Sequence, residues 1–140
     1  MITEFIEDVC HELEISVPKI SYDTSVLLSE TMMALCDGET IYIRKKDKPD
    51  PDTLFAIAHE LRHLWQIKYH ENEYMSDYKD RSVLDVEEYN LQIAEIDANA
   101  YAAIVMEFMV GLKPLFNGMS AEVVAKIQAR KLEILADLDT

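Results

Sequence analysis

The sequence predicts an α+β domain, with one small antiparallel sheet between an N-terminal helix and three later helices. Two observations support this prediction. Apolar residues recur at helical spacing in four segments, and an Asp-Gly turn separates two short apolar runs. The length of 140 residues is typical of one domain, and a hydrophobic content of 49% is sufficient for a core. We therefore expect residues 1–140 to form a single domain.

The first predicted helix covers residues 1–15, where apolar side chains recur every three or four positions. It ends before Pro18, because proline disfavours the helical conformation in the residue that precedes it. A hairpin follows, in which residues 31–36 and 39–44 flank Asp37-Gly38, a dipeptide that favours tight primed turns.

A basic run begins at the end of the second strand of this hairpin, with Arg44, Lys45, Lys46 and Lys48. Charged side chains of this kind are typical of an exposed edge strand that leads into a loop. The strand Thr40–Arg44 is accordingly expected to be either an ordinary guarded edge or an edge with which an extended peptide substrate pairs.

Two long helices are predicted next. Asp50-Pro51-Asp52 is a typical helix start and predicts a helix over about residues 53–69. The polar segment 70–82 has no clear period and is expected to be irregular. The second long helix is expected over about residues 83–110.

A last amphipathic helix is predicted near the C-terminus. Gly111 punctuates the chain after the second long helix, and Ser120 then caps a helix that reaches about Leu138. Its apolar side is expected to pack across the domain, and the alternative is a dimer face.

The charge of the chain argues against several classes of partner. Thirteen Lys and Arg residues stand against 27 Asp and Glu residues, so the formal charge is −14. Such a chain repels nucleic-acid phosphates and anionic membrane surfaces. No apolar run reaches the ~20 residues of a membrane span, and the acidic N-terminus does not resemble a signal peptide. With only Cys10 and Cys36, we expect a reduced cytoplasmic protein without a four-cysteine zinc site.

The sequence His59-Glu60-Leu61-Arg62-His63 is an HExxH motif within a predicted helix. Histidines at positions i and i+4 lie on one helix face, ~6 Å apart along the axis, and can share a tetrahedral zinc ion. Glu60 is then placed to act as general base on water at the metal. The alternative is a helix with two ordinary surface histidines, but apolar residues flank the pair where such a helix would carry charges.

Two histidines do not complete a metal site, so a third ligand is expected from the second long helix. Glu95 is our choice, and Glu88 is the alternative. Asp97 projects roughly opposite Glu95 on a regular helix and cannot serve the same ion. His70 lies ~10 Å beyond His63 along the axis and cannot reach it unless the helix breaks. His11 begins a similar pentapeptide that lacks a second histidine.

The motif followed 32 residues later by Glu95-Ile96-Asp97-Ala98-Asn99-Ala100-Tyr101-Ala102 resembles a gluzincin metallopeptidase, and most closely the small ImmA/IrrE-type group. The resemblance covers about residues 39–105. It implies a minimal zincin-like domain, with a small sheet packed on the HExxH helix and a glutamate-bearing helix. It also implies that Asn99, where the wider family often has an aspartate, accepts a hydrogen bond from a ligand histidine.

The function implied is that of a zinc endopeptidase of narrow specificity, acting on a protein such as a repressor. The acidic surface favours a basic substrate. Glu60 would shuttle the proton, and Tyr74 or Tyr78 would donate to the oxyanion unless they are ordinary loop tyrosines. Histidine and carboxylate ligands also accept Mn, Fe or Co. The alternatives are a catalytically silent zinc-bearing interaction module and, last, an acidic mimic of DNA.

Overall fold

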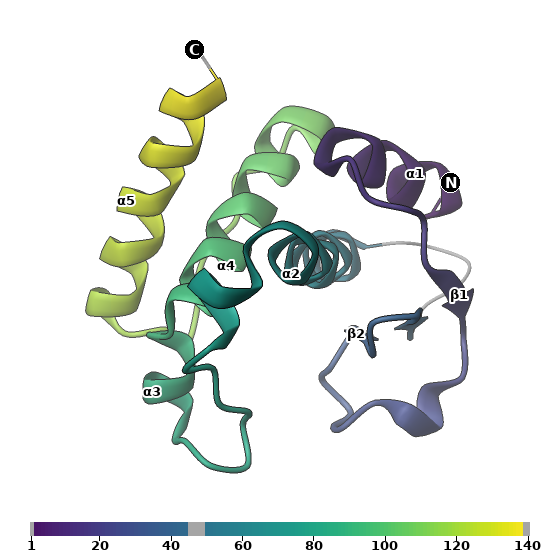
Figure 1. Ribbon diagram of the computed structural model, residues 1–140, viewed down its shortest axis with the longest axis horizontal. Helices are drawn as coiled ribbons and strands as arrows, with labels where there is room; N and C mark the ends of the chain where they lie inside the picture. Colours follow the sequence, from purple (N-terminus) through teal and green to yellow (C-terminus); the bar gives the residue numbers. More distant parts are fainter. Residues whose placement is uncertain (1, 45–49, 139–140) are drawn as a thin grey trace.

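The computed structural model describes residues 2–44 and 50–138 (Figure 1). Its elements are α1 (Ile2–Leu13), β1 (Lys19–Ser21), the 3₁₀ turn η1 (Thr24–Val26), β2 (Ala34–Cys36), β3 (Thr40–Ile43), α2 (Pro51–Met75), α3 (Val86–Asn90), α4 (Ile93–Val105), the π-helical turn η2 (Met106–Val110) and α5 (Ala121–Leu138). The fold is α+β, as the sequence predicts. No helix in the described ranges has the length and apolar composition required to cross a membrane.

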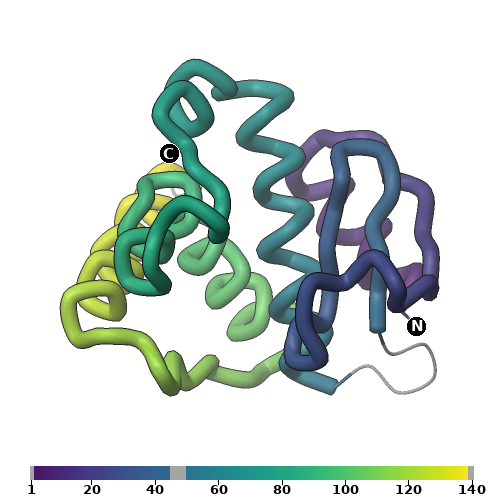
Figure 2. The backbone as a smooth tube through the Cα atoms, turned by 90° about the horizontal axis from the view of Figure 1, so that it is seen from below, coloured from purple at the N-terminus to yellow at the C-terminus, as the bar shows by residue number. Residues whose placement is uncertain are grey.

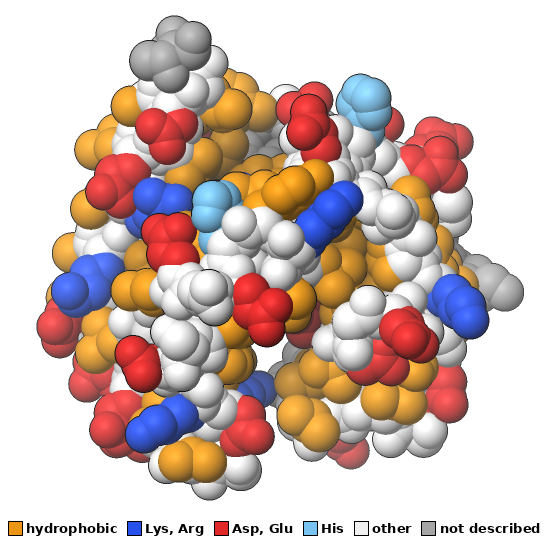
Figure 3. All heavy atoms as spheres, in the orientation of Figure 1, with side chains coloured by type: hydrophobic (Ala, Val, Ile, Leu, Met, Phe, Trp, Pro, Cys, Tyr) orange, Lys and Arg blue, Asp and Glu red, His pale blue; other side chains and the backbone are white. Residues whose placement is uncertain are grey.

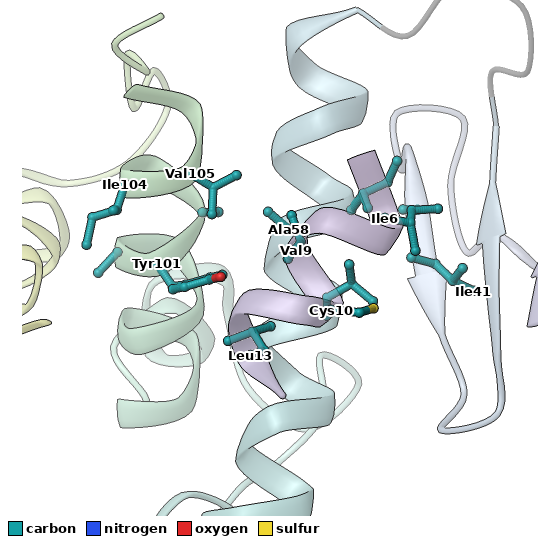
Figure 4. Close-up of a cluster of buried hydrophobic side chains, with 14 of the residues drawn as sticks. Ile6, Val9, Cys10, Leu13, Ile41, Ala58, Tyr101, Ile104 and Val105 are labelled. Carbon is teal, nitrogen blue, oxygen red and sulfur yellow. The ribbon is translucent and has the colours of Figure 1, made fainter. Parts of the chain in front are cut away.

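Helix α2 lies at the centre of the molecule. The sheet and α1 pack on one side of it, and α4 followed by α5 packs on the other (Figures 1 and 2). Figure 4 shows side chains of α1 directed into the space between α2 and the sheet, where Ile6 and Cys10 lie beside Ile41 and Val9 lies beside Ala58 of α2. Tyr101 extends from α4 toward Leu13 of α1. This core fixes α2 relative to its neighbours on both sides.

The predicted hairpin is confirmed, since β2 and β3 pair in antiparallel orientation around Asp37-Gly38. The Asp37 carboxylate accepts hydrogen bonds from the backbone N–H groups of Glu39 and Thr40, at 3.0 and 2.8 Å. Gly38 has a φ of 99°, which a residue with a side chain rarely adopts. The turn therefore holds β2 in a defined register with β3.

The expectation that Thr40–Arg44 forms an edge strand is wrong. The strand order is β1-β3-β2, so β3 is central and cannot pair with a further peptide. The expectation of an antiparallel sheet is also wrong, because the sheet is mixed and β1 pairs in parallel with β3. Strand β1 was not predicted, since its three residues after Pro18 are too few to show alternation. Lys45, Lys46 and Lys48 lie outside the described residues. The edge strand on the other side of the sheet is β2.

Helix α2 begins at Pro51, after Asp50 has capped it by accepting from the Thr53 N–H at 2.9 Å. The helical backbone is interrupted at His70, with φ of −141° and ψ of 38°, one residue after the predicted end. Contrary to the expectation of an irregular segment from residue 70, residues 71–75 are helical again. Residues 76–85 then connect α2 to α3 without regular structure.

The long helix predicted over residues 83–110 is wrong, because the chain is broken at Gln92 between α3 and α4. Gln92 has an extended backbone, with ψ of 143°, and its side chain bonds both the N–H and the C=O of Lys79 at 2.7 and 2.9 Å. These tertiary hydrogen bonds stabilise a helix break that the local sequence does not predict. Helix α4 continues into the π-helical turn η2, which ends at Gly111 with φ of 81°.

The last helix is confirmed with its cap, since the Ser120 hydroxyl accepts from the Val123 N–H at 3.2 Å. Its buried face, which includes Val123, Ile127 and Ile134, packs mainly on α4. The expected packing across the domain is therefore confirmed for this face.

Candidate metal centre

The structure brings His59, His63 and Glu95 together where α2 crosses α4. Nε2 of His59 lies 3.2 Å from Glu95 Oε1, and Nε2 of His63 lies 2.8 Å from Glu95 Oε2. The two Nε2 atoms are 3.1 Å apart. The side chains of the histidines are 17% and 14% exposed, whereas that of Glu95 is 3% exposed. Three potential ligand atoms thus converge at the wall of a cavity.

The other nitrogen of each imidazole ring faces an amide oxygen. Nδ1 of His59 lies 2.8 Å from Asn99 Oδ1, and Nδ1 of His63 lies 2.8 Å from Gln66 Oε1. The orientation of the Gln66 amide follows from its other contacts, because its nitrogen donates to the Ala94 carbonyl and to Asp97 Oδ2 at 2.9 and 2.8 Å. Its oxygen is therefore the atom that faces His63.

This arrangement determines where the protons lie. An amide oxygen only accepts, so each Nδ1 carries a hydrogen, and a ring in its neutral form directs the Nε2 lone pair toward Glu95. Two lone pairs and a carboxylate at about 3 Å repel one another unless a cation lies between them. The edge of a tetrahedron with ligand bonds of 2.0–2.1 Å is about 3.3 Å. The ligand atoms of His59, His63 and Glu95 lie at separations close to this edge, so the three residues could hold a metal ion.

The charges at the centre shift the pKa values in opposite directions. Burial by itself lowers the pKa of His63, but the hydrogen bond and the negative charge of Glu95 raise it to about 9. Burial by itself raises the pKa of Glu95, but the two histidines outweigh this effect and hold that pKa well below its usual range. Without a metal, a proton shared with Glu95 supplies the positive charge that the cluster requires.

Glu60 lies beside this cluster but is not one of its three potential ligands. Burial raises its pKa, and the positive charges that His59 and His63 can carry act in the opposite direction. The backbone amide of Cys36 in β2 also favours the ionised form. Glu60 therefore lies between the cluster and the edge strand β2. Among the described residues, its carboxylate forms no ion pair with a lysine or an arginine.

Asp97 takes no part in the cluster, as expected from its position opposite Glu95. It is 1% exposed and accepts two hydrogen bonds from Arg62 and one from Arg130, at 2.7, 3.0 and 2.8 Å. Because Asp97 also accepts from Gln66, this ion pair supports the orientation of His63 from behind. Sequence reasoning missed Gln66 and Arg130. Gln66 lies one helical turn after His63, and this spacing could have identified it as a neighbour of that ring. Arg130 is distant in sequence, so no spacing identifies it.

Of the two tyrosines considered, Tyr78 reaches the cluster and Tyr74 does not. The Tyr78 hydroxyl donates to Glu95 Oε2 at 2.8 Å and lies 2.8 Å from the Tyr89 hydroxyl. Burial, followed by the charge of Glu95, raises the pKa of Tyr78, so the phenol stays protonated. Tyr74 is buried elsewhere and accepts from Arg130 at 3.0 Å. Tyr89 was not identified from the sequence.

Three other candidates lie outside the cluster. Glu88 is exposed and closes a capping box with Asp85 at the start of α3, because the break at Gln92 removes it from the face of Glu95. The helical backbone is interrupted at His70, yet this residue pairs with Glu73 at 3.3 Å and packs on Trp65. His11 is exposed on α1.

The cluster opens into a cavity of about 880 Å³. One wall is the edge strand β2, and the opposite wall comes from the α2–α3 connection, including Tyr78 and Arg81. Figure 3 shows this side of the molecule hollowed between the same two segments. Apolar side chains dominate the remaining lining, among them Leu28, Met32, Met33, Phe55, Ile67, Met75 and Met119. The cavity can accept an extended chain with a large apolar side chain.

Comparisons of the chain with protein-family models, with curated proteins and with solved structures give no match.

Proposed function

We propose that this protein is a zinc-dependent peptidase with a minimal zincin-like fold. The observation that carries the proposal is Glu60, a carboxylate placed beside the convergent ligands His59, His63 and Glu95 but not among them. A purely structural metal site needs no such group, whereas hydrolysis of a peptide bond needs a general base. The open cavity in front of the cluster supports the same conclusion, because structural zinc sites are closed.

The metal would be held by His59, His63 and Glu95, and it would supply a Lewis acid and an acidified water molecule. Glu60 takes a proton from water as the oxygen attacks the peptide carbonyl, and returns a proton to the amine nitrogen as the C–N bond breaks. The Tyr78 hydroxyl lies on the cavity wall, and it would donate to the developing oxyanion by exchanging its hydrogen bond to Glu95 for one to the substrate.

The substrate is aligned by β2 rather than by β3. The edge of β2 lines the cavity, so its backbone groups can pair with an extended peptide segment, apart from the Cys36 amide that bonds Glu60. We propose a protein substrate of narrow specificity, with a basic surface that complements the charge of −14; a repressor is such a protein. This assignment also follows from the resemblance to the ImmA/IrrE-type peptidases.

A second function is favoured by the neutral partners of the two histidines. Asn99 and Gln66 add no negative charge behind the rings, which makes the imidazoles less basic ligands than a carboxylate partner would. A catalytically silent zinc-bearing interaction module would tolerate this, with the metal linking α2 to α4. The two functions differ in what they require of Glu60.

The experiment is a digestion of a peptide library prepared from a whole proteome, with cleavage sites read by mass spectrometry. Wild-type protein loaded with zinc is compared with Glu60→Gln loaded in the same way. New termini that share a large apolar residue at one subsite, present only with wild type, are the expected result. Identical peptide profiles for both proteins, with equal zinc contents, would contradict the peptidase and favour the silent module.

A further inference from the structure

A second cavity, of about 990 Å³, lies on the side of α2 opposite the metal centre. It is bounded by α1, by α4 with η2, and by the last turns of α5, and it shares no lining residue with the first cavity. Arg62 and Trp65 contribute from α2, and neither lines the first cavity. The proposed peptidase does not use this cavity, which we call the α1–α5 groove.

The floor and one wall of the α1–α5 groove are apolar. Leu13, Tyr101, Ile104, Val105, Ile134 and Leu135 line its interior. Phe108, Met109 and Leu138 also line it and are 72%, 42% and 69% exposed. Three large apolar side chains exposed at one cavity are a typical sign of a docking surface rather than of scattered surface residues. In Figure 3, hydrophobic side chains gather in the recess between α5 and α1.

The rim of the groove is acidic. Asp8 and Glu12 lie on the α1 side and Asp137 on the α5 side, and all three are exposed. The one arginine of the lining, Arg62, is 6% exposed, and its charge is neutralised by Asp97. His11 completes the rim. An occupant therefore needs an apolar face bordered by positive charge.

The walls of the groove determine the backbone conformation of its occupant. All three are helical, and no lining residue belongs to the sheet. An extended peptide would find no strand edge to satisfy its backbone N–H and C=O groups, whereas a helix satisfies them internally. A second copy of the chain would bring its own charge of −14 to an acidic rim, and an anionic membrane would be repelled in the same way.

We propose that the α1–α5 groove docks an amphipathic helix of a partner protein, whose apolar face enters the groove and whose flanking Lys and Arg residues pair with the acidic rim. Binding here leaves the metal centre free, because the two cavities open on different faces of α2. The partner can thus be held while a separate segment lies at the first cavity.

The test measures binding of an 18-residue fluorescent helical peptide made of Leu and Lys, by anisotropy, to the full chain. A peptide of the same pattern made of Leu and Glu is the control for charge. Phe108→Ser should weaken binding of the Leu/Lys peptide by about tenfold, while Leu115→Ser, at a residue 81% exposed outside the groove, should leave it unchanged. Both substitutions affect exposed side chains, so folding is preserved.

A charge-reversed pair provides a second, matched comparison. The double variant Asp8→Lys and Glu12→Lys should weaken binding by about tenfold, whereas Glu30→Lys and Glu39→Lys, with the same change in net charge at exposed sites away from the groove, should weaken it less than about threefold. No binding of the Leu/Lys peptide, equal binding of the Leu/Glu peptide, or equal effects of the paired variants would overturn the proposal. A dimer in sedimentation that Phe108→Ser dissociates would also overturn the proposal. Binding to phosphatidylserine vesicles that Phe108→Ser abolishes would overturn it as well.

Discussion

The amide oxygen of Gln66 lies 2.8 Å from Nδ1 of His63, and the amide nitrogen of the same residue is anchored to Asp97 and to the Ala94 carbonyl. Gln66 therefore fixes the tautomer of a proposed metal ligand, leaving Nε2 of His63 free to bind. The side chain is fully buried, so water does not replace it readily.

Replacing Gln66 by Leu should weaken zinc affinity by about 10–100-fold, because the ring of His63 loses the partner that orients it. Competition with a chromophoric chelator measures the affinity. Gln128→Leu, at an exposed position of α5, is the matched control and should leave the affinity unchanged. Equal affinities for wild type and Gln66→Leu would show that Gln66 is not a positioning residue for His63.

Asp97→Asn should lower the free energy of unfolding by about 3–5 kcal/mol, because Arg62 stays buried with its charge uncompensated. Urea denaturation at pH 7 measures the loss. Asp8→Asn, at an exposed residue of α1, should change the stability by less than about 0.5 kcal/mol. If both variants unfold at the same urea concentration, the ion pair contributes nothing.

The loss of stability in Asp97→Asn should depend on pH. Burial by itself raises the pKa of Asp97, but the hydrogen bonds and charge of Arg62 outweigh it and hold that pKa below its usual range. The stabilisation that the ionised Asp97 carboxylate provides is therefore present above the unfolded pKa of ~3.9. It is lost as the pH falls through the lower pKa that Asp97 has in the folded protein. The difference in stability between wild type and Asp97→Asn should shrink below about pH 4, and a difference that grew on acidification would contradict this sign.

Tyr78→Phe keeps the ring and removes the hydroxyl that donates to Glu95. If the hydroxyl also serves the oxyanion, kcat on a substrate found in the library should fall by about 10²-fold while the zinc content stays at the wild-type level. Tyr69→Phe, whose hydroxyl bonds the Glu14 carbonyl away from the centre, is the control. A Tyr78→Phe enzyme with unchanged kcat would remove Tyr78 from the mechanism.

The two cysteines should be poor nucleophiles in the folded protein. Burial is the main cause that raises the pKa of Cys10 and of Cys36 to about 11, so both remain protonated at pH 8. Because these pKa values are raised, the two protonated thiols favour the folded state below the unfolded pKa of ~8.5. This contribution to the free energy of unfolding is lost as the pH rises toward 11. Iodoacetamide at pH 8 should label both thiols in urea and neither in the native protein within the same time; similar rates would contradict the prediction.

The sequence predicts those parts of the fold that depend on local signals. Asp50-Pro51 starts α2, Asp37-Gly38 forms the turn of the hairpin, and Ser120 caps α5. The features that could not be predicted depend on tertiary contacts. Gln92 breaks a continuous apolar pattern only because it bonds Lys79, and β1 exists only because β3 is beside it.

The same distinction holds at the candidate metal centre. The helical spacing within one element places His59 and His63 together, and the apolar pattern around Glu95 selects it over Asp97. The reason for excluding Glu88 was not visible, because it depends on the break at Gln92. Tyr89 bonds Tyr78 and Arg130 bonds Asp97 behind the centre. Both come from separate elements, so no sequence spacing marks them.

The most direct test of the account is the metal content of the purified protein after equilibration with zinc, measured by elemental mass spectrometry. Wild type should hold about one zinc per chain, and Glu95→Gln should hold little or none at the same free zinc concentration, because it removes the ligand carboxylate. Glu88→Gln makes the same change at the exposed alternative and should retain about one zinc. Wild type without bound zinc, or equal retention by Glu95→Gln, would contradict the proposed centre.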